Sequence, residues 1–299
     1  MSMNGTAGLA KVRAWVSRAV VRACAGVAVM GVGVGVGVGW GCGERGYSQE
    51  TPEEVVRSAV LMIERGEAKR LGELMYGADV YERAFFRRVG SLLGSMQGLA
   101  EALARAFPRE VEAAKEQAVA RAARGARSGS AVSMLMSRTA SGEQREAAMQ
   151  TLMREVFADP FGWANEASSR VTFAPINEDL VAVMWDGKPV PPFGLTMRRS
   201  EGKWFVVAPT NIPFLVRYLP QTKEDWSLWA SLVRLIDNAV VDLTGDVREG
   251  RVASFSDTGR KVGEKLFMPG ALALVAVEKH YRLKFQRQRE ARSGASSPG

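Results

Sequence analysis

Three carboxylates beside one apolar run are the side chains of this sequence best placed for acid–base chemistry. Glu178 and Asp179 precede the run at residues 180–185, and Asp186 follows it. Two carboxylates that face one concave pocket can divide the work of a general acid and a general base. Asp-Gly and Asn-Glu-Asp are also common turn sequences. We therefore interpret these residues first as turns, and we predict no catalytic residue.

The only histidine gives no second route to catalysis. His280 lies in an expected helix between Lys279 and Tyr281, and nothing in the sequence identifies an acid that would orient it or a nucleophile that it would activate. We interpret it as a lone surface histidine. The only cysteines, Cys24 and Cys42, lie in or at the end of an N-terminal leader, residues 1–42. The rest of the chain, its body, therefore has neither a disulfide framework nor a thiolate metal cluster. We predict no metal site.

A glycine pattern near the start of the body imitates a nucleotide-binding motif. Gly41, Gly43 and Gly46 spell G-x-G-x-x-G, but a dinucleotide site needs a strand before this pattern and a helix opening on the third glycine. Polar residues and then Pro52 follow instead. The sequence contains no G-x-S-x-G, H-E-x-x-H or Walker A pattern. We predict no cofactor.

Tryptophans offer the one sign of an apolar ligand site. Trp185, Trp204, Trp226 and Trp229 could line a pocket for a small apolar molecule, although their helical and strand spacing fits core packing first.

The excess of basic over acidic residues is concentrated at the two ends of the chain. Four cations and no acid precede Cys42, and 36 basic against 32 acidic residues follow it, so the formal charge of +8 is no general sign of nucleic-acid binding. The C-terminal segment could meet anionic lipid or RNA, but we favour a solvated helix end and predict no nucleic-acid partner. Its cations are Lys279, Arg282, Lys284, Arg287, Arg289 and Arg292, interleaved with Tyr281 and Phe285.

The leader predicts export. Residues 23–43 form an uncharged stretch of 21 residues behind the four cations, long enough for a helix of about 30 Å. A retained anchor, a cleaved signal peptide and a lipidated cysteine all remain open. Gly41-Cys42 resembles the cleavage box of bacterial lipoproteins, although Gly39 and Trp40 replace the usual bulky aliphatic residue. That resemblance implies acylation of Cys42. Each alternative anchors or delivers the body to the cell envelope, facing the periplasm or exterior.

The remaining chain alternates between helical patterns and one stretch of strands. Thr51-Pro52, Asp79 and Thr222 are expected helix starts, and Ile236 belongs to the apolar face of the helix that follows Thr222. Pro269 should start a further helix whose apolar side carries residues 272, 275, 276, 279 and 283. The apolar run at 180–185 and the alternation at 195–198 predict strands.

We expect residues 1–42 to be a signal peptide or anchor and 43–50 a short linker. Residues 51–220 should form an α+β domain with a helical insertion and a flexible loop near 125–142. A helical extension at 221–285 and a disordered tail at 286–299 complete the division. Strands are confined to residues 170–208, where Asp186-Gly187 and the sequence Ser-Glu-Gly-Lys at 200–203 predict turns.

Residues 51–75 and 195–207 together resemble the NTF2-like (cystatin-like α+β) domains of exported bacterial proteins. The resemblance rests on a Pro-capped first helix, a Gly-Glu break, a Leu-x-x-Leu second helix and the step Gly202-Lys203-Trp204. It implies a curved antiparallel sheet, which could be cone-shaped, with the first helix packed into it. It carries over no catalytic residue.

We therefore predict a mostly helical α+β fold with a small antiparallel meander. The predicted function is that of an envelope-anchored, non-enzymatic binding or structural module. The alternative is an NTF2-like enzyme or a small apolar ligand-binding protein. The expected partners are the membrane, through the N-terminal lipid or helix, and an unknown protein or small apolar ligand.

Overall fold

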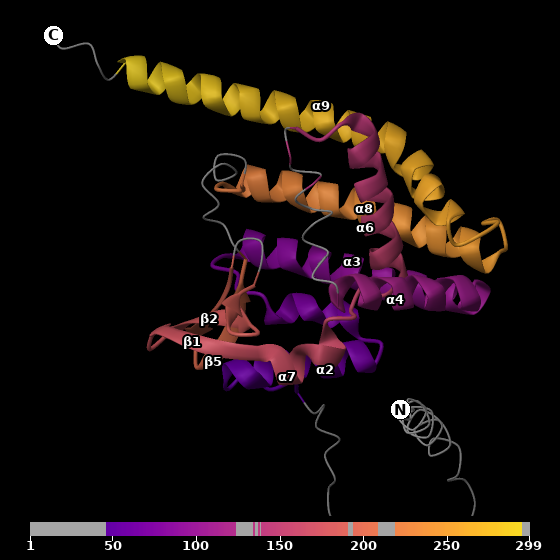
Figure 1. The fold of residues 1–299 in the computed structure, drawn as a ribbon. Helices are drawn as coiled ribbons and strands as arrows, with labels where there is room; N and C mark the ends of the chain where they lie inside the picture. Colours follow the sequence, from indigo (N-terminus) through magenta and orange to yellow (C-terminus); the bar gives the residue numbers. More distant parts are fainter. Residues whose placement is uncertain are drawn as a thin grey trace, which may run out of the picture. The chain divides into compact units, whose positions relative to one another are not determined.

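A computed structural model describes residues 46–123, 134, 137, 139–190, 194–208 and 219–294. Residues Tyr47–Gly299 form one compact unit, called here the body (Figure 1). The leader with Cys42, most of the loop expected at 125–142 and the last five residues lie outside the described residues.

The body is α+β, as the sequence predicted, with helices on either side of one small sheet in chain order. Its first half contains α2 (Pro52–Glu64), the 3-10 helix η2 (Ala68–Leu74), α3 (Val80–Ala106), α4 (Pro108–Ala123), α6 (Gly142–Ala158) and α7 (Ala164–Arg170). The strands are β1 (Val171–Asn177), β2 (Leu180–Trp185), β3 (Lys188–Pro189), β4 (Leu195–Ser200) and β5 (Lys203–Val207). Two long helices follow, α8 (Lys223–Arg248) and α9 (Asp257–Gly294).

The strands form an antiparallel meander in the order β1-β2-β4-β5, with the short β3 also paired to β2. Asp186 and Gly187 both have positive φ, as do Glu201 and Gly202, so each pair makes the kind of tight turn that hairpins favour. Both turns are where the sequence predicted them. The free edge of β5 is covered, because Trp204 N–H donates to Gln49 O and Tyr76 N–H donates to Val206 O. These contacts block pairing with another chain.

Helix α2 packs on one face of this sheet. Thr51 caps α2 by accepting the Glu54 N–H, and Pro52 occupies the first turn, as the sequence predicted. The contact between helix and sheet forms one of two apolar cores. Its buried members are Val55, Ala59, Met62, Leu74, Val181, Val183, Met197 and Trp204.

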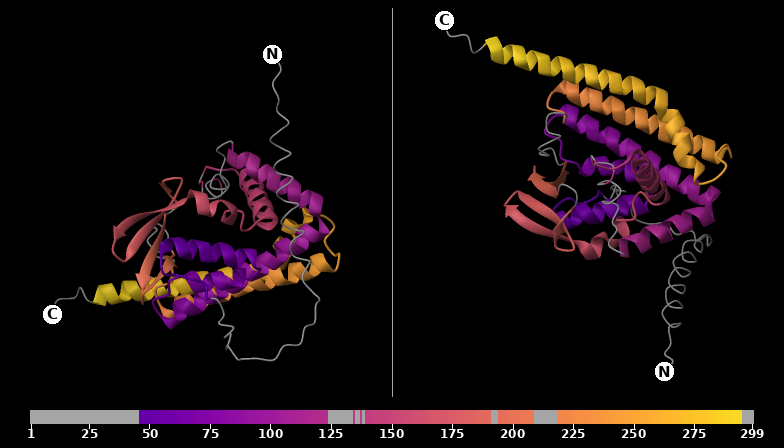
Figure 2. Two further views of the ribbon diagram at one scale, coloured as in Figure 1. Left: turned by 90° about the horizontal axis from the view of Figure 1, so that it is seen from below. Right: turned by 45° about the horizontal axis from the view of Figure 1, so that its top comes forward.

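The second core lies among the helices. Figures 1 and 2 show α3, α8 and α9 side by side, with α8 in the middle. Ser91 Oγ of α3 donates to Asp237 Oδ2 of α8 at 2.8 Å. The buried members are Leu99, Ala102 and Leu103 of α3, Val111 and Ala114 of α4, Phe157 and Ala158 of α6, Val240, Leu243 and Val247 of α8, and Val252 and Phe255 before α9.

Five details differ from the sequence-based expectation. The second helix is 3-10 rather than α, and the short helix α7 was not predicted. Residues 257–294 form one helix with Pro269 inside it, so residues 286–294 of the expected disordered tail are helical. Ile236, assigned to the apolar face of α8, is 40% exposed. The linker expected up to residue 50 is packed in part, since Gln49 bonds to β5.

The β4–β5 turn offers a simple test of the backbone geometry. Glu201 has φ of 52°, a region that costs an L-residue about 1 kcal/mol and that asparagine tolerates better. Glu201→Asn is therefore expected to raise the free energy of unfolding by about 0.5–1 kcal/mol, measured by urea denaturation. Gly202→Ala, at φ of 76°, should lower it. A stabilising Gly202→Ala would show that the turn is built differently.

Candidate functional site

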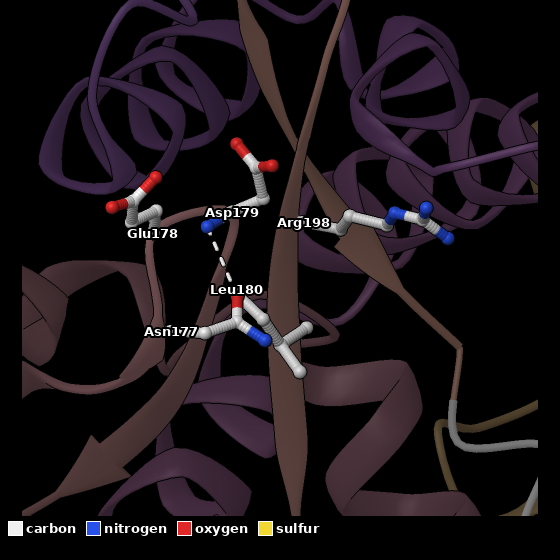
Figure 3. A pocket seen from close by; sticks show the side chains of 5 residues that line it. All are labelled: Asn177, Glu178, Asp179, Leu180 and Arg198. Carbon is white, nitrogen blue, oxygen red and sulfur yellow. Dashed lines mark hydrogen bonds between the residues drawn. The ribbon is translucent and has the colours of Figure 1, made fainter.

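The turn carboxylates do not meet in one site. Glu178 and Asp179 line an open hollow of about 490 Å³ together with Asn177, Leu180 and Arg198. Figure 3 shows that the Glu178, Asp179 and Arg198 side chains point away from one another. Asn177 Oδ1 accepts the Asp179 N–H at 3.0 Å, a bond typical of an Asx turn. The hollow contains charged groups, but their geometry is that of a solvated turn.

Asp186 lies at the opposite end of β2 from that hollow. Arg170 donates through Nε to Asp186 Oδ1 at 2.9 Å and also pairs with Glu166, while its guanidinium carbon lies 5.0 Å from the centroid of the Trp185 ring. The hydrogen bonds to Asp186, and then those to Glu166, raise the pKa of Arg170 above its usual value. Asp186 thus joins the β2–β3 turn to the end of α7, and the structure does not bring it together with Glu178 and Asp179.

The four tryptophans do not gather in one pocket either. Trp204 is 8% exposed in the core between α2 and the sheet, and Trp185 lies beneath Arg170. Trp226 packs 5.2 Å from the Phe85 ring of α3. Trp229 donates a hydrogen bond from α8 to α9. Each tryptophan therefore serves a different packing contact.

A cluster of polar side chains is centred on Asp225, whose side chain is 0% exposed. His280 Nε2 lies 2.6 Å from Asp225 Oδ1, and Lys284 Nζ donates to Asp225 Oδ2 at 2.5 Å. Trp229 Nε1–H donates to the Tyr281 hydroxyl at 3.1 Å, and the rings of His280 and Tyr281 meet edge to face, 5.2 Å apart. We call these five residues the Asp225 cluster. It joins the first turns of α8 to the second half of α9.

Local structure fixes the position of the central carboxylate. Asp225 is the third residue of α8, and with Thr222 it forms a capping box in which each side chain accepts the other residue's N–H at 3.2 Å. The Gln221 N–H also donates to Asp225 Oδ2, at 3.0 Å. Because His280 and Lys284 are four residues apart, they lie on the same face of α9. That face is turned toward α8.

Hydrogen bonding keeps this buried carboxylate ionised. Burial alone would raise the pKa of Asp225, but the donors Lys284, His280 and the Gln221 N–H together hold the pKa well below its usual range. Burial also raises the pKa of the Tyr281 hydroxyl, partly offset by the bond from Trp229. Since an ionised carboxylate only accepts hydrogen bonds, His280 Nε2 donates to it.

A carboxylate that is hydrogen-bonded to a histidine supplies two of the three members of a catalytic triad. In this cluster, however, the same carboxylate also accepts bonds from Lys284 and two backbone N–H groups. Lys284 is only 15% exposed and lies 5.6 Å from the centroid of the Tyr281 ring, so it neutralises Asp225 from within the helix contact. The arrangement is best suited to clamp α8 against α9.

The interpretation of His280 as a lone surface residue was therefore wrong. Its side chain is 28% exposed and bonded to a buried acid 55 residues earlier in the chain. Sequence reasoning identified the helix cap around Thr222 but not this second role of Asp225. The four-residue spacing of His280 and Lys284 was the available signal, and the facing acid could not be located without the fold.

The stability supplied by the Asp225 cluster should depend on pH. An aspartate whose pKa is lowered on folding contributes stability fully above its unfolded pKa of about 3.9 and loses it as the pH falls toward the folded value. Wild type should therefore exceed Asp225→Asn in unfolding free energy by a constant amount above about pH 5, and this difference should shrink below about pH 4. Urea denaturation between neutral and acid pH measures it, with the exposed Asp242→Asn as the matched control. A difference that did not shrink in acid would contradict an ionised Asp225.

Within the described ranges, no three or more His, Cys, Asp or Glu side chains are grouped so as to hold a metal ion. None of the described helices is both long enough and apolar enough to cross a bilayer. Comparison with known proteins gives no match: no family model, no curated protein and no solved structure is significantly similar to this chain.

Proposed function

We propose that this chain is a lipoprotein anchored in the cell envelope, and that its body is a non-enzymatic binding or structural module. The proposed location depends on the sequence, in which four cations precede an uncharged stretch of 21 residues with Gly41-Cys42 near its end. In this proposal Cys42 carries the lipid. The body would then face the periplasm or the exterior.

One observation carries the non-enzymatic part of the proposal. The sheet face on which an NTF2-like pocket would open is filled by Val181, Val183, Met197 and Trp204, each at most 8% exposed. Val55, Ala59 and Met62 of α2 pack against them. A face filled with apolar side chains in close contact has no room for a substrate or for a carboxylate to act on one.

The alternative is an NTF2-like enzyme or a protein that binds a small ligand. The hollow at Asn177, Glu178, Asp179, Leu180 and Arg198 is the observation that favours it, since it combines two carboxylates with a cation. The divergent directions of these side chains weigh against concerted acid–base work (Figure 3).

Lipidation is tested by following acyl incorporation into the chain expressed in bacteria. We expect the wild-type chain to incorporate labelled fatty acid and to fractionate with membranes, and Cys42→Ser to lose both. Cys24→Ser is the matched control and should behave as wild type. Membrane fractionation of Cys42→Ser without acylation would instead favour a retained spanning helix.

Native mass spectrometry tests the role of the body. A defined oligomer, or the bare monomer mass, agrees with a binding or structural module. A small molecule retained at one equivalent per chain, and lost on Arg198→Gln, would favour the ligand-binding alternative.

A further inference from the structure

Helix α9 exposes aliphatic side chains along one face. Leu272 is 68% exposed, Val275 64% and Leu283 43%, and Ala276 and Lys279 are exposed between them. Residues 272, 275, 276, 279 and 283 follow the three- and four-residue spacing of a single helical stripe. We call them the α9 stripe. The sequence marked it as the apolar side of a helix, yet the structure turns it to solvent.

The stripe cannot turn inward, because the other side of α9 is already packed. Tyr281 is 3% exposed and accepts the Trp229 hydrogen bond, while His280 and Lys284 hold the buried Asp225. Rotating α9 to bury Leu272 and Leu283 would leave that carboxylate without the hydrogen bonds from His280 and Lys284. The stripe is therefore fixed outward by the Asp225 cluster.

Positive charge accompanies the aliphatic residues. Residues 278–294 contain six basic and two acidic residues. Lys279 lies within the stripe, and Arg282 beside it is 63% exposed and pairs with Glu278 at 2.9 Å. A helix with aliphatic residues on one side and lysine or arginine among them is the pattern that binds anionic lipid interfaces.

We propose that the α9 stripe lies on the surface of a bilayer that contains anionic lipid, with Leu272, Val275 and Leu283 inserted among the acyl chains and Lys279 and Arg282 at the headgroups. The stem of a lysine can follow the apolar surface while its ammonium reaches the phosphates. A second copy of the chain in parallel register would instead bring Lys279 against its counterpart. Nucleic acid would attract the cations but would gain little from three aliphatic side chains.

The inference rests on the proposed function in one respect, since an envelope location puts the body next to lipid. Its test does not depend on acylation. Both apolar cores lie within Tyr47–Gly299, a compact unit by itself, so that part of the chain is expected to fold and can be tested without Cys42. Failure of vesicle binding would refute the stripe, whereas failure of acylation would refute the anchor.

The experiment is sedimentation of residues 47–299 with vesicles of phosphatidylcholine alone or mixed with phosphatidylglycerol. We expect binding only to the anionic vesicles, weakening as salt is raised. Leu272→Ser with Leu283→Ser should weaken binding by about tenfold or more. The double variant Lys279→Gln with Arg282→Gln should also weaken binding, by a factor of about five for each charge that faces lipid. Val119→Ser, which alters a side chain that is also 68% exposed but lies on α4, should leave it within a factor of about two.

Circular dichroism melts must coincide for all variants, which is expected because every altered side chain is exposed. The proposal is overturned if binding is absent, if it is equal on both kinds of vesicle, or if Val119→Ser weakens it as much as the leucine pair does. A dimer in solution that the leucine pair disrupts would assign the stripe to a second copy. Tight RNA binding with no lipid binding would assign it to nucleic acid.

Discussion

Gly90→Ala is expected to lower the free energy of unfolding by about 3 kcal/mol, although alanine is the better helix former by about 1 kcal/mol. Gly90 lies inside α3, where the helix meets η2. A Cβ atom at this position would lie 2.2 Å from the Lys69 carbonyl oxygen and 3.3 Å from the Gly72 nitrogen. Both are backbone atoms, so neither can move aside as a side-chain end would. The two elements must separate, and the packing between α3 and η2 is lost.

Gly98 provides a matched control in the same helix. A Cβ atom at Gly98 meets nothing within 4 Å, so Gly98→Ala should stabilise the protein by about 0.5–1 kcal/mol. Urea denaturation followed by circular dichroism measures both variants. If both changes stabilised the protein, α3 and η2 would not be in the close contact described above.

Asp225→Ala should be the second most damaging change, lowering the free energy of unfolding by about 3 kcal/mol. The variant leaves Lys284 and His280 without their acid and removes one side of the capping box at the start of α8. The damage should concentrate where α8 meets α9. Hydrogen exchange of residues 276–290 should therefore rise more than that of α2.

A double-mutant cycle separates the ion pair from the cap. Lys284→Met keeps most of the apolar volume of lysine and removes its charge. Combined with Asp225→Ala, it should cost at least about 1 kcal/mol less than the sum of the two single changes. The control is Thr222→Ala, which removes only the cap and should cost about 1 kcal/mol. Strict additivity of Asp225→Ala and Lys284→Met would show that the two side chains do not interact.

The parts of the fold that were predicted correctly are those coded by neighbouring residues. The caps at Thr51, Asp79 and Thr222 and the turns at 186–187 and 201–202 each depend on side chains within about four positions. The short apolar run at 180–185 and the alternation at Leu195 and Met197 then identified β2 and β4. These local signals were enough to assign an α+β fold with a small antiparallel meander.

The missed features depend on contacts between distant parts of the chain. The 3-10 form of η2 goes with the approach of Gly72 to the Phe86 carbonyl oxygen, 14 positions away. The short helix α7 has only seven residues and no side-chain cap. The outward face of α9 follows from the pairing of Asp225 with His280, because a helix with apolar residues on two sides does not reveal which one will be buried.

The candidate site was predictable only in part. Glu178 and Asp179 were correctly interpreted as turn residues, and the hollow they line was not foreseen. The Asp225 cluster joins five residues that the sequence does display, but on helices whose facing sides only the fold reveals.

The most direct test of the central claim, that the leader delivers the body to the envelope, is a reporter enzyme fused after Tyr47. The reporter must fold only where disulfides form, outside the cytosol. We predict that it is active in cells that carry the intact leader and inactive when the four leader cations and residues 23–43 are deleted. If that reporter were inactive, and a second reporter that works only in the cytosol were active when fused at the same position, the result would contradict the export, the acylation of Cys42 and the envelope role together.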